Sequence, residues 1–154
     1  MGVSRESPAP EAVADQWEEL LADADAMAER YRAEGWDALV LTARDVAVLE
    51  GEPFGLEVSV SEGEYGRVEE LVGTGAVDRT HAFRRDAEGI RLLVVVAEAS
   101  AAEEAVLVPV SVPLEALQAL RARAAEAGVM YTHVRTPATD TRVTVQHDDP
   151  ELFL

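Results

Sequence analysis

Three histidines and a pair of adjacent aspartates are the side chains whose types could support acid–base or metal chemistry in this sequence. His81, His133 and His147 fall in or beside stretches with strand character, and Asp148 and Asp149 follow the last of them. Imidazole nitrogens and carboxylate oxygens are common ligands of zinc and other divalent metals. One hypothesis is therefore a metal site whose candidate ligands are His81, His133, His147, Asp148 and Asp149.

Strand geometry argues against the simplest form of this metal site. If Arg135 pairs with Thr141 in a hairpin, His133 and His147 share one face but lie four residues apart, or roughly 13 Å along the strands. A Zn–N bond is about 2.0 Å long, so one ion cannot bind both rings.

His81 has a structural interpretation beside the chemical one. It alternates with Val77 and Phe83, which favours a packed or hydrogen-bonded core histidine. We therefore expect His81 to be structural, and we expect the protein to hold no cofactor.

Arginines gather in and around one predicted hairpin, at Arg79, Arg84, Arg85 and Arg91. Pairing Arg85 with Ile90 across a four-residue turn at 86–89 places Arg84 opposite Arg91, and like charges in that position destabilise a sheet. One interpretation is a small patch that binds an anion or an acidic partner. The alternative, which we favour, is neutralisation by the chain's own carboxylates, for example those of Asp78, Asp86 and Glu88.

The sequence offers few residues that could act as nucleophiles in covalent catalysis. The chain has no Cys and no Lys, and it has no G-x-S-x-G nucleophile motif and no P-loop. These observations disfavour thiolate, Schiff-base and P-loop chemistry, and we assign no catalytic residue.

The charge balance is the strongest global signal. Among 154 residues there are 30 acidic and 13 basic side chains, all of the basic ones Arg, which gives a formal net charge of −17. So much like charge destabilises a compact chain at low salt, whereas molar salt shortens the Debye length to about 3 Å. The composition predicts a salt-adapted protein, and it disfavours nucleic-acid binding because phosphate contacts require local positive charge. No stretch approaches the length of a membrane span, and residues 1–10 lack the apolar core of a secretory signal, so we expect a cytoplasmic protein without membrane association.

Hydrophobic periodicity predicts one α/β (α+β) domain over residues 10–154, preceded by a flexible arm at 1–9. The order is α-β-β-(β)-α-β-β-β-α-β-β, with a single, mainly antiparallel sheet, two long helices and one short helix. Strands at 36–42 and 45–50 are separated by a short link, which favours a hairpin. Pro109 assigns the strand at 105–112 to an edge or a bulge. The predicted helices cover 10–34, 64–72 and 113–127, and the predicted strands cover 36–42, 45–50, 56–61, 77–85, 90–97, 105–112, 129–135 and 141–147.

Two resemblances follow from these patterns. The element order over residues 11–127 is similar to that of roadblock/longin and profilin-like domains, although no motif supports the similarity. Over nearly its full length the chain resembles a family of small acidic haloarchaeal proteins of unknown function. The residues that carry this second resemblance are Gly35-Trp36-Asp37, Asp45 to Leu49, Thr132 to Arg135 and Val143 to Pro150. This second resemblance implies a haloarchaeal origin, and it implies no particular activity.

Two functions remain open at this point. The first is a non-catalytic interaction or small-ligand-binding module acting as a homodimer, because an apolar face of the strands at 90–97 and 105–112 would be left over if all helices packed on the other face. The second is a hydrolytic enzyme that uses His and carboxylates, with or without a metal. The tail Asp148–Leu154 either binds a protein partner or packs Leu152 and Phe153 on its own domain.

Overall fold

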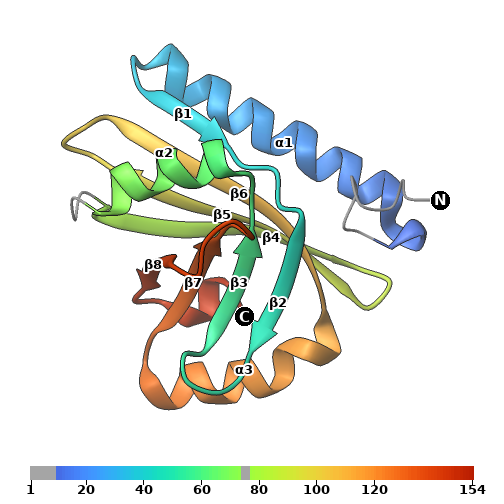
Figure 1. Cartoon of the computed structure of the whole chain (residues 1–154). Helices are drawn as coiled ribbons and strands as arrows, with labels where there is room; N and C mark the ends of the chain where they lie inside the picture. Colours follow the sequence, from blue (N-terminus) through green and yellow to red (C-terminus); the bar gives the residue numbers. More distant parts are fainter. Residues whose placement is uncertain (1–9, 74–76) are drawn as a thin grey trace.

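A computed structural model describes residues 10–73 and 77–154, so the predicted arm at 1–9 lies outside the described residues. Within them the chain folds into two four-stranded sheets and three α-helices (Figure 1). The order of elements along the chain is as predicted. The elements are η2 (Glu11–Val13), α1 (Ala14–Ala33), β1 (Asp37–Val40), β2 (Asp45–Leu49), β3 (Gly55–Ser59), α2 (Glu62–Gly73), β4 (Arg79–Ala87), β5 (Ile90–Ala99), β6 (Glu104–Pro113), α3 (Leu114–Ala127), β7 (Met130–Arg135), β8 (Arg142–His147) and η3 (Pro150–Leu152).

The prediction of a single, mainly antiparallel sheet is wrong. Sheet A has the order β1-β6-β5-β4 and sheet B the order β2-β3-β7-β8. Both sheets are mixed, because β1 runs parallel to β6 and β3 runs parallel to β7 while the other neighbours are antiparallel.

The two sheets separate at the link that was expected to close a hairpin. The backbone N–H of Leu41 donates to the carbonyl of Leu107 in sheet A, and that of Arg44 donates to the carbonyl of Ser59 in sheet B. Residues 41–44 therefore carry the chain from one sheet to the other. Strand periodicity identifies the two strands but not their neighbours, because the same alternation suits a hairpin and a crossing between sheets.

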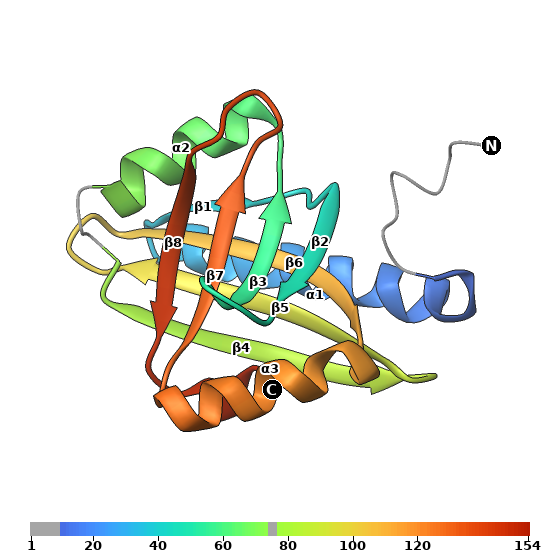
Figure 2. The ribbon, with the colours of Figure 1, turned by 60° about the horizontal axis from the view of Figure 1, so that its bottom comes forward.

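The two faces of β5 are covered within one chain. Leu92, Val94 and Val96 pack against α1, and Leu93 and Val95 face the core between the sheets. Figure 2 shows sheet B crossing one face of sheet A while α1 lies along the other. The leftover apolar face that motivated the homodimer prediction is therefore buried in the monomer.

Pro109 lies in an interior strand, which contradicts its assignment to an edge or bulge. β6 pairs with β5 over its whole length, without a bulge, and Val94 lies opposite Pro109. On its other side β6 pairs with β1 only from Glu104 to Leu107. Pro109 lies beyond the end of β1, so the N–H that proline lacks is not needed for that ladder.

The helix boundaries agree with the sequence signals. Gly128 caps α3 with φ 77°, and its N–H donates to the carbonyl of Ala124 at 2.7 Å. Gly35, with φ 88°, follows the end of α1. Within the described ranges, no helix is long and apolar enough to cross a membrane.

Candidate functional site

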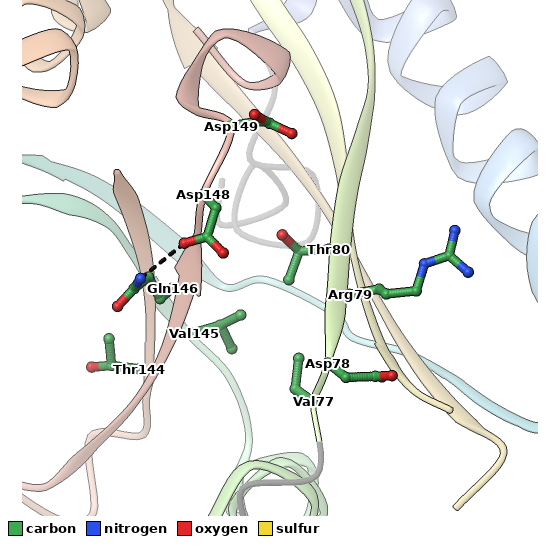
Figure 3. A pocket seen from close by; sticks show the side chains of 9 residues that line it. All are labelled: Val77, Asp78, Arg79, Thr80, Thr144, Val145, Gln146, Asp148 and Asp149. Atoms are coloured by element: carbon green, nitrogen blue, oxygen red, sulfur yellow. Dashed lines mark hydrogen bonds between the residues drawn. The ribbon is translucent and has the colours of Figure 1, made fainter. Parts of the chain in front are cut away.

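A cleft of about 530 Å³ lies between the edge strands β4 of sheet A and β8 of sheet B. We call it the β4–β8 cleft (Figure 3). Its volume is in the range of small-molecule sites. The residues that line it come from the start of β4 and the end of β8, and they are Val77, Asp78, Arg79, Thr80, Thr144, Val145, Gln146, Asp148 and Asp149.

Three carboxylates line this cleft in different ways. Asp148 accepts a hydrogen bond of 2.9 Å from the Gln146 amide, and both Asp148 and Asp149 are exposed. Asp78 accepts from the backbone N–H of Ser100 at 2.9 Å, and this bond holds the pKa of its carboxyl below the usual range. Among the described residues, no basic side chain forms an ion pair with any of the three.

Arg79 lines the cleft with the aliphatic part of its side chain, and its guanidinium lies outside the cleft. Its side chain points away from β8 in Figure 3. Its Nε lies 3.7 Å from a carboxylate oxygen of Glu98 on the neighbouring strand β5. The cleft therefore has a negative potential, because its one lining arginine is directed toward Glu98.

His147 lies beneath the cleft and is fully buried. Its Nδ1 is 2.9 Å from the Thr80 hydroxyl in sheet A, and its Nε2 is 2.8 Å from the Thr132 hydroxyl in sheet B. The Phe153 ring packs on the imidazole with centroids 4.1 Å apart. Burial lowers the pKa of His147 from 6.5 to about 4, partly offset by the charge of Asp148. The ring is neutral at pH 7 and is too weak a base to activate a hydroxyl or water efficiently there.

His133 and His147 lie on opposite faces of sheet B, not on one face as the predicted pairing requires. The structure pairs Arg135 with Arg142, one residue away from the predicted partner, so His133 lies opposite Thr144 and His147 opposite Met130. A one-residue shift in pairing reverses the face of every side chain in the shifted strand.

His133 has a structural environment on its own face. Its Nε2 donates to the carbonyl of Phe54 at 2.9 Å, so in the neutral ring Nδ1 accepts from the Thr144 hydroxyl at 2.8 Å. It is buried beside Tyr131, with ring centroids 6.0 Å apart. Both of its ring nitrogens are engaged within the chain.

His81 lies in a separate groove between β4 and α1, beside Met27, Tyr31 and Phe83. It is half-buried rather than in the core, and Phe83 is exposed. The three histidines therefore do not converge. Over residues 10–73 and 77–154, no group of three or more His, Asp or Glu side chains is arranged to hold a metal ion.

The four candidate arginines are also separated, because the turn after β4 is tighter than predicted. Glu88 and Gly89, with φ 52° and 77°, form a two-residue turn of type I′ geometry, so Asp86 rather than Arg84 lies opposite Arg91. Asp86 accepts hydrogen bonds of 2.8 and 3.0 Å from Arg91.

Most of these arginines are paired with the chain's own carboxylates. Arg85 contacts Glu19 and Asp23 of α1, on the opposite face from Arg91. Arg84 donates instead to the backbone carbonyl of Glu151 at 3.2 Å. Arg79, Arg85 and Arg91 thus each lie beside a carboxylate of the chain itself.

Thr80, Thr144 and Gln146 line the cleft but were not among the sequence candidates. They are polar residues within strands and belong to no recognisable motif. They come together only because β4 of sheet A lies beside β8 of sheet B. Asp148 and Asp149 were identified by their position after His147, and both do line the cleft.

The tail packs largely on its own domain. Phe153 and Leu154 are buried, whereas Leu152 is 41% exposed. Arg121 of α3 donates to the carbonyl of Leu154 at 3.0 Å.

A family of unknown function, DUF7529, has a sequence model that matches residues 3–154. No curated protein and no solved structure matches the chain. Since the match covers nearly the whole chain, this protein belongs to that family of unknown function.

Proposed function

We propose that this member of a family of unknown function is a non-catalytic module that binds a small polar cation in the β4–β8 cleft. The observation that carries the proposal is the cleft of about 530 Å³ between the edges of two sheets, with the carboxylates of Asp148 and Asp149 at its surface. Carboxylates without a basic partner favour a positively charged ligand. The Thr80 hydroxyl and the Gln146 amide add polar groups that orient a ligand by hydrogen bonds.

Binding is better supported than hydrolysis by the state of the histidine nearest the cleft. A general base requires a free nitrogen and a pKa near the working pH. Both nitrogens of His147 are in hydrogen bonds with threonines, and its pKa is about 4. Its role is to join the two sheets beneath the cleft, which keeps the lining residues of β4 and β8 in a fixed arrangement.

The composition supports a cytoplasmic, salt-adapted setting for this module. A net charge of −17 with no Lys suits a protein that works where salt screens its own repulsion. Binding of a cation at molar salt then depends on fitted contacts within the cleft more than on long-range attraction.

Calorimetric titration in molar KCl tests the proposal with a panel of small organic ammonium compounds and with uncharged compounds of the same size. Saturable binding by at least one ammonium compound, and by none of the uncharged ones, is expected. Asp148→Asn combined with Asp149→Asn should weaken that binding at least about tenfold, because the charge-assisted contacts are lost.

Glu18→Gln on the exposed face of α1 is the matched control, and it should leave the affinity unchanged. Equal affinity in the cleft variant and the control would contradict the proposal. Turnover of a bound ester or amide compound would favour the hydrolytic alternative instead.

A further inference from the structure

The free edge of β4 is longer than any other free edge among the described strands. β4 spans nine residues, whereas the other edge strands, β1, β2 and β8, span four, five and six. It pairs with β5 continuously from Arg79 to Ala87, with no bulge and no proline. Proteins usually shorten, bend or interrupt an edge of this length, because it can accept another strand.

The turn at Glu88–Gly89 determines which backbone groups of β4 face outward. Ala87 and Ile90 flank a two-residue turn, so their N–H and C=O groups bond each other. Because bonding alternates along an antiparallel pair, the groups of Arg85 and Phe83 also face β5. The backbone groups of Ala82, Arg84 and Asp86 therefore face away from the sheet.

An exposed aromatic side chain lies in the middle of this edge. Phe83 is 40% exposed. It borders a groove of about 380 Å³ whose other apolar residues include Met27 and Tyr31 of α1. Covering this ring removes apolar surface from water, so this position favours association.

The charges around the end of β4 come close to balancing, although those of the chain as a whole do not. The three arginines Arg84, Arg85 and Arg91 lie beside the carboxylates of Glu19, Asp23 and Asp86, and Glu88 of the turn adds one more carboxylate. In a chain of net charge −17, this weakly charged region is where two copies meet with little repulsion. It offers no net attraction to an acidic peptide.

We infer that β4 pairs antiparallel with β4 of a second copy, in the register that places Arg84 opposite Asp86 of the second copy. By twofold symmetry the same contact forms twice, and the outward backbone groups of both residues bond each other. In this register residues 83–87 of each β4 overlap, and Phe83 packs against Ala87 of the second copy. The two Arg85 side chains meet at the axis, where each is already paired with Glu19 and Asp23.

Sedimentation equilibrium in molar KCl, at tens of micromolar protein, tests the pairing. A particle of twice 16.6 kDa is expected. Phe83→Ser and Arg84→Glu should each weaken the dimer at least about tenfold, the first by loss of apolar contact and the second by placing like charges opposite each other. Far-UV circular dichroism establishes that each variant is folded.

Leu21→Ser is the matched control, since Leu21 is exposed to a similar extent (36%) on α1 but lies beside Val40 and Pro109, away from β4. It should leave the dimer intact. A wild-type particle of 16.6 kDa would overturn the inference, and so would a dimer that both β4 variants leave unchanged. The cation-binding proposal is tested separately, because its variants lie on the segment after β8.

Discussion

The side chains of Thr80 in sheet A and His147 in sheet B are joined by a hydrogen bond of 2.9 Å, which links the edge strand of one sheet to the edge strand of the other. On its other side His147 bonds Thr132, so one buried imidazole bridges hydroxyls from both sheets. Burial keeps the ring neutral, so one of its nitrogens donates to a threonine hydroxyl and the other accepts from one.

This bridge predicts that the protein loses stability in mild acid. The pKa of His147 is about 4 in the folded chain and about 6.5 when unfolded, so the unfolded state binds the proton more readily. The His147 contribution is present above pH 6.5 and is lost as the pH falls toward 4, by about 3 kcal/mol in all. Urea unfolding between pH 7 and pH 4 measures the loss.

His147→Gln provides the comparison, because an amide can bond both threonines but does not titrate. Its free energy of unfolding should fall less steeply over the same pH range. Parallel pH profiles for the two proteins would show that His147 is not the responsible group.

Asp86→Asn should lower the free energy of unfolding by about 2 kcal/mol. Arg91 is buried, and the change leaves its guanidinium without the carboxylate that accepts two of its hydrogen bonds. Breaking a fully buried pair costs about 3–5 kcal/mol, and the partial exposure of Asp86 reduces this. Chemical denaturation measures the change, with Asp25→Asn on the exposed face of α1 as the control that should stay within about 0.5 kcal/mol.

Gly55→Ala should destabilise the fold by about 3 kcal/mol or more. Gly55 has φ 129°, and a Cβ there would lie 2.2 Å from the backbone oxygen of Tyr131 on the neighbouring strand β7. Relief requires β3 and β7 to separate, which breaks a central pair of sheet B.

Gly63→Ala in α2 is the matched control, since a Cβ there meets nothing within 4 Å. It should be neutral or stabilising by up to about 1 kcal/mol, because alanine favours helix. Similar thermal midpoints for the two variants would contradict the steric account of Gly55.

Glu88→Asn should raise the free energy of unfolding by about 0.5–1 kcal/mol. Glu88 has φ 52° in the turn between β4 and β5, a conformation that asparagine adopts more readily. Gly89→Ala at the next position, with φ 77°, should change stability in the opposite direction. Chemical denaturation of both variants at one salt concentration tests whether the free energy of unfolding rises for Glu88→Asn and falls for Gly89→Ala.

Thermal stability should rise with salt from tens of millimolar to molar KCl. Screening reduces repulsion among 30 acidic side chains that only 13 arginines offset. Differential scanning calorimetry across that range measures it, and a midpoint that is unchanged or higher at low salt would refute salt adaptation.

Local patterns in the sequence predicted the elements better than their partners. Gly128 and Pro113 mark the ends of α3, and the uninterrupted apolar run from Leu92 to Val96 is typical of a strand covered on both faces. Neither pattern identifies which sheet a strand joins. The parallel partner of β1 is β6, far along the chain, and short-range signals hold no information about such a contact.

The candidate site was less predictable for a related reason. Asp148 and Asp149 were identified by their neighbour His147, but the faces of the histidines depended on pairing Arg135 with Arg142 rather than Thr141. Likewise, a two-residue turn instead of a four-residue turn replaced an Arg84–Arg91 contact by the Asp86–Arg91 ion pair. In both hairpins a small change in turn length altered which side chains meet.

Among the described strands, the one parallel pair in each sheet has a consequence for the rate of folding. Asp37 lies opposite Glu104 in sheet A, and Leu56 lies opposite Thr132 in sheet B, so each pair closes a long loop. Loop closure must be completed before such contacts contribute energy, and topologies rich in them fold slowly. The β4–β5 and β7–β8 hairpins are local and should form early, whereas the docking of β1 and β3 should limit the rate at which the native protein forms.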